Sequence, residues 1–286
     1  MRSWHPSLLL ILMSTVSGRI IDLSHKHGPT TFMVPGFEHY NRTLVKTLIF
    51  NKDVAVETAV YSSNEHGGTH MDAPLHFYKV GMTLDNIPLE NTIAEGVMID
   101  VSDEASKNIE YKVPLSKIHA WEKQNGEIPQ KAAVIFNFGW HKKFHNKFEY
   151  INTVTDDWRQ IKIPSVSEEV GNFLYDSRDI KIIGVDTMSP DPMNTGSAPI
   201  HIKYLANNKL IVENLNATDS LPPRGFRFHA APVKYVGASG AQIRAYAIVH
   251  ENQEPRTKNQ ENRSWIILPT WCLVIILLFS HLVILL

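Results

Sequence analysis

The stretch EHGGTHMDAPLHF gathers side chains that could bind a metal ion. It holds His66, His70, Asp72 and His76 within eleven residues, next to a glycine pair. Imidazole nitrogens and carboxylate oxygens are suitable ligands for zinc, manganese or iron. The alternative is a solvated loop whose histidines bond to backbone carbonyls, and a single histidine would favour that interpretation. Four potential ligands in so short a stretch favour the metal site.

The spacing of these residues limits how they can meet. They occupy relative positions 0, 4, 6 and 10. On a helix of about 3.6 residues per turn, only His66 and His70 would share a face, and the glycines and a nearby proline disfavour a helix. In an extended strand all four would share one side, but the ends would stand about 33 Å apart. The side chains can therefore converge only if the stretch folds back, and Gly67–Gly68 supplies the backbone freedom.

Strands and helices are mixed along the chain around this stretch. Apolar runs of strand length recur at residues 19–23, 97–101, 133–138, 180–185, 209–212 and 243–249. Residues 165–169 suit the capped first turn of a helix that runs to Tyr175. This mixture indicates an α/β or α+β class. Since no linker or repeat interrupts residues 19–250, one domain is expected there.

A family resemblance rests on this stretch and on segments that follow it. HGGTHMDAPLHF resembles the signature of the cyclase-type metal-dependent hydrolases, the group that includes bacterial kynurenine formamidase and isatin hydrolase. Four other segments are similar to family segments and come in the family's order: IDLSH from Ile21, IFNFGW at 135–140, IIGVDTMSPDP at 182–192 and GASGAQIRAYAIV at 237–249. The resemblance implies an α/β fold of the cyclase type, a swivelling β/β/α domain with a mixed sheet.

The resemblance also implies ligands far along the chain. The segment APIHIKYLANNKLIVENL matches a family segment in which a histidine and a glutamate twelve residues later complete the metal site, here His201 and Glu213. Pro199 can begin a short helix that carries His201, and the strand at 209–212 delivers Glu213. Without the first motif, a surface histidine and a solvated glutamate would be the simpler interpretation.

The same resemblance divides the ligands between two ions. His66, His70 and Asp72 would hold one ion, and Asp72, His201 and Glu213 would hold a second where a binuclear site forms. The implied cofactor is a divalent metal, zinc or manganese, with one or two ions per chain. Such an ion lowers the pKa of its water towards about 7 and polarises a carbonyl. His76 would remain as general acid and base, so the expected reaction is hydrolysis of a carbon-nitrogen amide bond.

The substrate contacts are less clearly indicated. Kynurenine formamidases resemble one another in a WPG segment after the first strand, and this chain has Val34 in place of the tryptophan. Phe32 could supply a replacement ring, and Trp140 could stack on an aromatic substrate or pack in the core. Phe77 is expected in the core.

Three functions remain open from the sequence. The leading one is an aryl-formamidase similar to kynurenine formamidase, and the second is a hydrolase of a cyclic amide such as isatin. The third is a non-catalytic secreted or surface binding protein of the same fold. A serine nucleophile is not indicated, because no serine lies in a Gly-x-Ser-x-Gly setting. Asp186 and Asp191 could line the cleft, but they lie near prolines and are expected to form turns.

Both ends of the chain carry apparent targeting signals. A basic residue, an apolar run and small residues predict a signal peptide over residues 1–18. Residues 251–264 form a polar spacer, and residues 265–286 form an apolar segment that suits a transmembrane helix or a lipid-anchor signal. The expected location is the secretory pathway, at the cell surface or outside the cell, with a membrane anchor at the C-terminus. Glycosylation sequons occur at Asn41, Asn216 and Asn262.

Composition narrows the expected partners. The 286-residue chain has a formal net charge of -1 and no long run of lysine or arginine, so nucleic acid is not expected as a partner. The expected partners are a small-molecule substrate, the membrane through the C-terminal tail and, from the resemblance, a second copy in a homodimer. The single cysteine, Cys272, lies in the apolar tail. Any metal ligands in the preceding domain must therefore be nitrogen and oxygen atoms.

Overall fold

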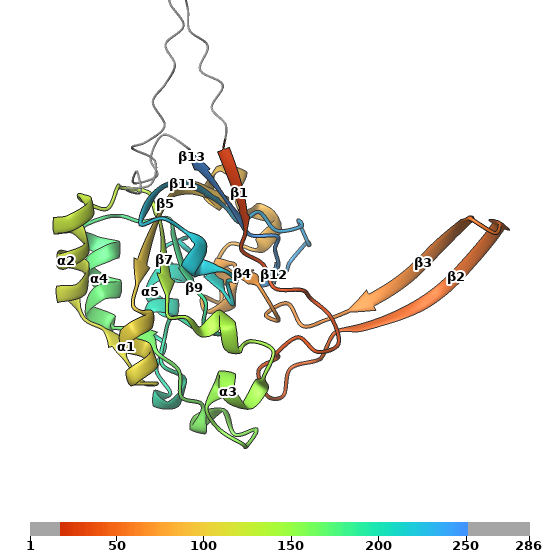
Figure 1. Ribbon diagram of the computed structural model, residues 1–286, viewed down its shortest axis with the longest axis horizontal. Helices are drawn as coiled ribbons and strands as arrows, with labels where there is room; N and C mark the ends of the chain where they lie inside the picture. Colours follow the sequence, from red (N-terminus) through yellow and green to blue (C-terminus); the bar gives the residue numbers. More distant parts are fainter. Residues whose placement is uncertain (1–17, 251–286) are drawn as a thin grey trace, which may run out of the picture. The chain divides into compact units, whose positions relative to one another are not determined.

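A mixed nine-stranded sheet forms the centre of the structure, a computed structural model that describes residues 18–250 (Figure 1). In spatial order its strands are β1 (Gly18–Asp22), β13 (Tyr246–His250), β11 (Arg224–His229), β5 (Ile93–Asp100), β7 (Ala133–Asn137), β9 (Ile182–Val185), β10 (Leu210–Glu213), β4 (His70–Asp72) and β12 (Gly240–Gln242). The central strands β5, β7, β9 and β10 are parallel, and the strands on either side are antiparallel. The expected α/β fold with a mixed sheet is confirmed.

Helices pack against this sheet through one apolar cluster. They are α1 (Ser102–Lys107), α2 (Leu115–Asn125), α3 (Lys147–Ile151), α4 (Glu168–Asp176) and α5 (Pro199–Ala206). Buried residues such as Ile118 of α2, Val170 of α4 and Tyr204 of α5 belong to the same cluster as Val134 and Phe136 of β7. The alternate β7 residues belong to a second cluster on the other side of the sheet. β7 is therefore apolar on both faces, as its continuous apolar sequence indicates.

The predicted elements lie close to where the sequence pattern puts them. Each predicted strand overlaps one strand of the central sheet. The runs that form the central strands are buried and apolar, whereas β1 at the sheet edge is largely exposed. The helix predicted from residue 165 begins at Glu168, where the Ser167 hydroxyl accepts a hydrogen bond from the Val170 backbone N–H. The helix predicted from Pro199 also begins at that residue and ends before Asn207. The capping residues therefore locate both helix starts.

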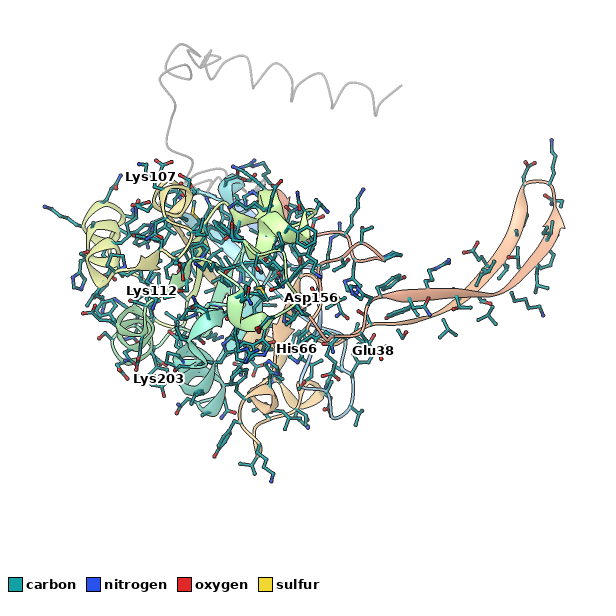
Figure 2. All side chains as sticks on the ribbon, turned by 90° about the horizontal axis from the view of Figure 1, so that it is seen from below. Glu38, His66, Lys107, Lys112, Asp156 and Lys203 are labelled. Atoms are coloured by element: carbon teal, nitrogen blue, oxygen red, sulfur yellow. The ribbon has the colours of Figure 1, made fainter. Side chains whose placement is uncertain are left out.

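Two small sheets lie outside the central one, and the sequence pattern did not indicate either. β6 (Lys112–Val113) pairs with β8 (Ser165–Val166), and β2 (Asn41–Asn51) pairs with β3 (Val54–Ser62) as a long hairpin. Every residue of β2 and β3 is exposed, and side chains stand on both faces of the hairpin (Figure 2). Because residues 18–250 bury neither face of the hairpin, the usual alternation of apolar and polar residues is missing there.

The expected membrane-anchored, cell-surface location is corrected by the structure. Within residues 18–250, none of the helices has the length and apolar character needed to cross a bilayer. The longest, α2, has 11 residues, whereas a bilayer core needs about 20. The chain divides into two units, Met1–Gln253 and Glu254–Leu286. The predicted polar spacer, the apolar tail and all but the last residue of the predicted signal peptide lie outside the described residues.

The predicted glycosylation sites depended on that location. Asn41 is exposed at the start of β2, and Asn216 is half-buried, with its backbone N–H bonded to the carbonyl of Leu23. Asn262 lies outside the described residues.

Candidate active site

Neighbouring strands carry three of the predicted metal ligands. β4 and β10 are antiparallel neighbours, with Glu213 opposite His70 and Ile211 opposite Asp72. Because side chains alternate along a strand, His70 and Asp72 point to the same side of β4. Glu213 is the last residue of β10 and joins them across the pair. The strand register therefore brings together ligands that are far apart in the sequence.

A tight turn at the glycine pair precedes β4. Gly68 has a φ of +66°, in the left-handed region, and a Cβ there would lie 2.6 Å from Nδ1 of His27. A Cβ at Gly67 would lie 2.2 Å from Sδ of Met33. The turn returns His66 to β4, where its Nδ1 lies 2.7 Å from Oδ1 of Asp72. The stretch thus folds back at the glycine pair, as its spacing requires.

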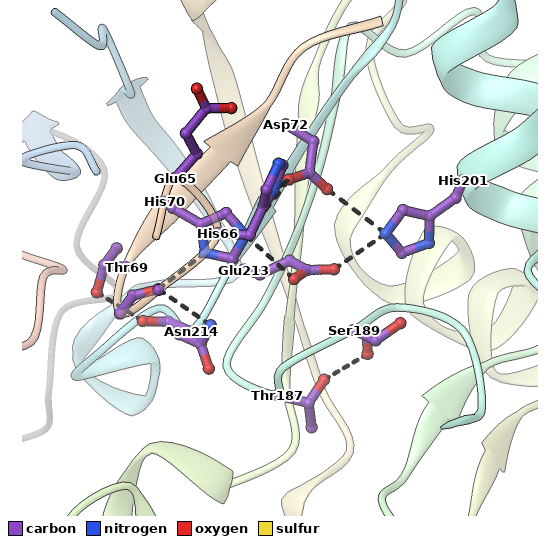
Figure 3. A network of polar contacts seen from close by, with 12 residues as sticks. Glu65, His66, Thr69, His70, Asp72, Thr187, Ser189, His201, Glu213 and Asn214 are labelled. Carbon is purple, nitrogen blue, oxygen red and sulfur yellow. Dashed lines mark hydrogen bonds and ion pairs between the residues drawn. The ribbon is translucent and has the colours of Figure 1, made fainter. Parts of the chain in front are cut away.

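His201 lies in the first turn of α5, and its ring points toward Asp72 and Glu213. Its Nε2 lies 3.4 Å from Oδ2 of Asp72 and 3.2 Å from Oε1 of Glu213. From the other side, Nε2 of His70 lies 3.3 Å from Oδ1 of Asp72 and 3.4 Å from Oε2 of Glu213. The two carboxylates therefore stand between the two imidazole rings (Figure 3). The structure places the other four predicted ligands, His66 included, around Asp72.

The inner atoms of this cluster have no hydrogen-bond partner within residues 18–250. They are Nε2 of His70, Oδ2 of Asp72 and Oε1 of Glu213, and all are buried. Leaving a buried polar atom unpaired costs free energy, because the atom has lost its water. One ligand atom from each of these residues lies within 4.8 Å of the others. The residues therefore fit a divalent cation held by nitrogen and oxygen ligands.

The charges of the cluster also favour a cation. Burial, together with the charge of Asp72, raises the pKa of Glu213. Burial opposes a positive charge on His70, but the carboxylates of Asp72 and Glu213 outweigh it and raise the pKa of His70 to about 9. Without a metal, protonated histidine thus balances the buried carboxylates. A divalent cation would supply that positive charge from the centre and bind the neutral rings.

His66 and His76 form a second group beside the first. Their rings stack 3.7 Å apart, and one ligand atom from each lies within 4.8 Å of an Asp72 oxygen. Both nitrogens of His66 already have partners, Oδ1 of Asp72 at 2.7 Å and Oγ of Ser239 at 2.9 Å. Burial lowers the pKa of His76 to about 4. The charge of Asp72 raises this pKa, and the charge of His66 lowers it further. His76 is therefore neutral near pH 7 and able to accept a proton.

The two aspartates expected as turn formers are buried and bonded to histidines. Asp186 accepts hydrogen bonds from the backbone N–H of Phe138 and of Trp140, and it pairs with Nδ1 of His141 at 3.0 Å. Asp191 pairs with Nδ1 of His201 at 2.7 Å. The sequence contained a signal that these aspartates lie at the site, since both residues follow the buried strand β9. The carboxyl ends of parallel strands are where sites in such sheets form.

A cavity of about 300 Å³ opens beside the ligand cluster. The polar part of its wall is formed by His66, His76, Asp191, His201 and Glu213, together with Ser189 and Ser197. The larger apolar part includes Val34, Phe37, Phe77, Trp158, Met188 and Met193. No lysine or arginine is among the described residues that line it. A mostly apolar wall with a few convergent polar groups suits a small organic ligand.

The predicted substrate contacts divide between this cavity and the core. Val34 lines the cavity. Phe32 and Trp140 are 6% and 1% exposed, and both contact Tyr150, so both belong to the core. Phe77, which was expected in the core, is 43% exposed, lines the cavity and lies 4.5 Å from the ring of His201. The expectations for Phe32 and Phe77 are therefore corrected, and of the two positions left open for Trp140 the structure shows the core.

Other lining residues were not singled out from the sequence. Phe37, Met188 and Met193 lie in segments without regular periodicity, and Trp158 lies in a polar segment where it is 45% exposed. An exposed tryptophan among polar residues was the one available signal, since such a side chain often serves recognition.

Comparison with known proteins agrees with the fold and the site. A model of the Cyclase family, described as "Putative cyclase", matches residues 21–192, more than half of the chain. Isatin hydrolase of Roseibium aggregatum is 28% identical over 194 residues, which cover 65% of this chain and 72% of that protein. Kynurenine formamidase of Salinibacter ruber is 25% identical over 227 residues, which cover 79% of this chain and 95% of that protein.

A solved structure is similar over nearly the whole described region. Isatin hydrolase A from Ralstonia solanacearum superposes with a TM-score of 0.74 and 27% sequence identity, covering 82% of this chain and 92% of that chain. The match of the family model, the shared fold and the ligand cluster on β4, β10 and α5 are consistent with one another. This chain is a member of the cyclase family.

Proposed function

We propose that this protein is a metal-dependent hydrolase that cleaves a carbon-nitrogen amide bond of a small aromatic substrate. The convergence of His70, Asp72 and Glu213 carries this proposal, because one ligand atom from each lies within 4.8 Å of the others beside a cavity, and each residue has a buried polar atom that makes no hydrogen bond within residues 18–250. The similarity to an isatin hydrolase and a kynurenine formamidase supports it. Zinc or manganese is the proposed metal, with one or two ions per chain.

The proposed ligands share Asp72. In the two-ion arrangement, His66, His70 and Asp72 hold one ion, and Asp72, His201 and Glu213 hold the second. The distances support a further set for a single ion, His70, Asp72 and Glu213, whose ligand atoms lie within 4.8 Å of one another. Asp72 belongs to every set, so its loss should weaken metal binding the most.

The side chains around the cluster can take separate roles in amide hydrolysis. A bound divalent cation would lower the pKa of a water molecule and polarise the substrate carbonyl. Neutral His76 accepts a proton from the attacking water as the new carbon-oxygen bond forms. When the carbon-nitrogen bond breaks, His76 returns that proton to the leaving nitrogen. Phe77 and Trp158 bind the apolar part of the substrate and exclude bulk water from the site.

Two substrate classes follow from the cavity. An aryl-formamide, as in the kynurenine formamidases, is the first, because the wall is largely apolar and contains aromatic rings. A cyclic amide of the isatin type is the second. Val34 supports it, since Val34 lines the cavity and stands where the resemblance implies the tryptophan of a WPG segment in kynurenine formamidases. A non-catalytic binding protein of the same fold remains the third hypothesis, and an absence of turnover with metal bound would favour it.

We also propose that the protein forms a homodimer through the β2–β3 hairpin. The hairpin exposes Leu48, Ile49, Phe50, Val56 and Val60, by 44% to 76%. A two-stranded hairpin with no covered face is at best marginally stable in water, and a large exposed apolar surface usually marks an interface. A second copy of the chain can cover this surface symmetrically.

Metal analysis and hydrolysis assays test the proposed function. The purified protein should contain zinc or manganese, and it should hydrolyse formylkynurenine or isatin until a chelator removes the metal. His76→Ala should reduce kcat by at least about 100-fold while the metal content stays unchanged. His119→Ala, at an exposed residue of α2, is the control and should retain full activity. A protein that binds neither metal, or a His76→Ala variant with full activity, would contradict the assignment.

A further inference from the structure

The Asp191 carboxylate contacts both the backbone and the ring of His201, one of the proposed metal ligands. It lies in the loop after β9 and is 2% exposed. Its Oδ2 accepts a hydrogen bond from the His201 backbone N–H at 2.9 Å and lies 2.7 Å from Nδ1 of the His201 ring. Its Oδ1 accepts a hydrogen bond from the Ile200 backbone N–H at 3.0 Å. One carboxylate therefore caps the first turn of α5 and orients the side chain that this turn carries.

The contact between Asp191 and Nδ1 of His201 determines which nitrogen of the ring faces the ligand cluster. Because a carboxylate accepts and does not donate, the Nδ1 of His201 must carry the proton of that contact. In a neutral ring, the lone pair is then on Nε2. Nε2 is the atom that lies 3.4 Å from Oδ2 of Asp72 and 3.2 Å from Oε1 of Glu213. In its neutral form the ring is thus turned so that the Nε2 lone pair faces the ligand cluster, as a metal ligand requires.

The other histidine of the inner cluster is held differently. Nδ1 of His70 lies 2.8 Å from the backbone carbonyl of Gly68, a neutral acceptor. A carboxylate at Nδ1 increases the basicity of a ring more than a neutral carbonyl does, and such partners tune the affinity of a metal site. His201 therefore depends on a removable side chain for its orientation, whereas His70 depends on the backbone.

Asp191 is itself fixed before any ligand arrives. Its backbone N–H donates to Oγ of Ser189 at 3.0 Å, and the hydroxyl of Thr187 donates to the Ser189 carbonyl at 2.8 Å. Ser189 and Asp191 are 4% and 2% exposed. Figure 3 shows the contact between Thr187 and Ser189 beneath the ligand cluster. The loop therefore holds the carboxylate rigidly, which reduces the entropy that binding would otherwise cost.

We propose that Asp191 is a positioning residue that fixes the tautomer and orientation of His201 and thereby sets the affinity of the site for a divalent cation. This inference rests on the proposed function, because it assigns His201 to the metal. Asp191 does not itself need to touch the metal or the substrate. Its effect should pass through the His201 ring.

Asp186 offers a matched control within the same segment. It is fully buried, accepts hydrogen bonds from backbone N–H groups and pairs with Nδ1 of a histidine, as Asp191 does. Its histidine is His141, whose Nε2 lies 3.4 Å from Asp219 and does not face the ligand cluster. Loss of the Asp186 charge should therefore affect folding in a similar way and leave the metal unaffected.

Competition between the protein and a chromogenic chelator, with zinc as the probe, tests the inference. In Asp191→Asn, one carboxylate oxygen becomes an NH₂ group, so the one remaining oxygen cannot accept from both the Ile200 backbone N–H and the His201 ring. We expect zinc to bind about 10- to 100-fold more weakly than in the wild type. Asp186→Asn should keep the wild-type zinc affinity. In a His201→Ala background, adding Asp191→Asn should change zinc affinity by less than about 2-fold, since the ring through which Asp191 acts is gone.

A measurement on the wild type covers the case in which Asp191→Asn does not fold. In the zinc-loaded protein, long-range ¹H–¹⁵N spectra should show His201 protonated at Nδ1 and bound to zinc through Nε2. Zinc bound through Nδ1 would overturn the inference, as would wild-type zinc affinity in Asp191→Asn or an equal loss in Asp186→Asn. If the wild type binds no zinc or manganese, the proposed function itself fails. If the wild type binds zinc and Asp191→Asn binds it equally well, only the role of Asp191 fails.

Discussion

Burial and nearby charge give the histidines of this protein different protonation states. Desolvation lowers the pKa of His25 to about 3 and that of His76 to about 4. Two carboxylates overcome the same desolvation at His70 and raise its pKa to about 9. A buried histidine beside two carboxylates can thus carry charge or bind a cation, whereas at His25 and His76 desolvation dominates and the ring is neutral near pH 7. The neutral His76 ring has a lone pair that can accept a proton.

His25 should make the fold sensitive to acid. Burial, reinforced by the charges of His145 and His141, lowers its pKa, and its ring stacks on Phe144 at 3.8 Å. In the unfolded chain His25 binds a proton below pH about 6.5, whereas in the folded chain it binds one only below about 3. The free energy of unfolding should therefore fall as the pH drops through this window, by up to about 1.4 kcal/mol per pH unit.

Urea denaturation at pH 7 and pH 5 can measure this contribution. His25→Phe keeps a ring against Phe144 and removes the titrating group, so the variant should lose about 1 to 2 kcal/mol less than the wild type between these pH values. An identical pH dependence in both proteins would show that another group is responsible.

At the scale of elements, the site forms where a short strand, a strand end and a helix start meet. β4 has three residues, and it lies between β10 and β12 in the sheet. The close approach of β12 requires Gly240, because a Cβ there would lie 2.6 Å from Cε1 of His66. The first turn of α5 then brings His201 over the same point. Each element contributes one or two ligands, so the cluster depends on the register of β4 against both neighbours.

The β2–β3 hairpin should control the oligomeric state. Leu48 and Val56 are paired across the hairpin and are 44% and 47% exposed. Replacing both with aspartate should convert the proposed dimer to a monomer, because two charges would be buried in the interface without partners. Light scattering coupled to gel filtration measures the mass. Lys52→Asp, at the exposed turn, makes the same change in net charge and should leave the dimer intact.

Two results would contradict this expectation. A wild-type protein that is monomeric at micromolar concentration would exclude the proposed dimer, and a Leu48→Asp, Val56→Asp variant that remains dimeric would place the interface elsewhere.

At the scale of the whole molecule, a bound metal should raise the stability of the folded chain. Unfolding separates ligands that come from β4, β10 and α5, so the metal should bind the folded state far more tightly than the unfolded state. At a free zinc concentration 100 times the dissociation constant, the gain is about 2.7 kcal/mol. Thermal unfolding with zinc and with a chelator should therefore give clearly different Tm values.

Asp72→Ala provides the control for this prediction, because Asp72 contacts His66, His70 and His201. Its Tm should not respond to zinc. A wild-type Tm that is unchanged by zinc and by chelator would mean that no metal links these elements.

The sequence by itself determined the chemistry available and the main strands. The residues around His70 are suitable metal ligands, and their spacing requires a fold-back at the glycine pair, which the structure has. Continuous apolar runs identified the buried strands, because strands buried on both faces have that pattern. Ser167 and Pro199 located two helix starts, because capping is a local interaction.

Only the tertiary structure decided which side chains face one another. Phe32 and Trp140 pack in the core and Phe77 lines the cavity, although all three are aromatic residues in similar settings. Asp186 and Asp191 share one segment, yet Asp186 holds His141 away from the ligand cluster and Asp191 holds His201 within it. Periodicity along one element reports which of its faces is buried, but it does not report what lies across from that face. That information comes from contacts between elements far apart in the chain, which form only when the whole sheet has assembled.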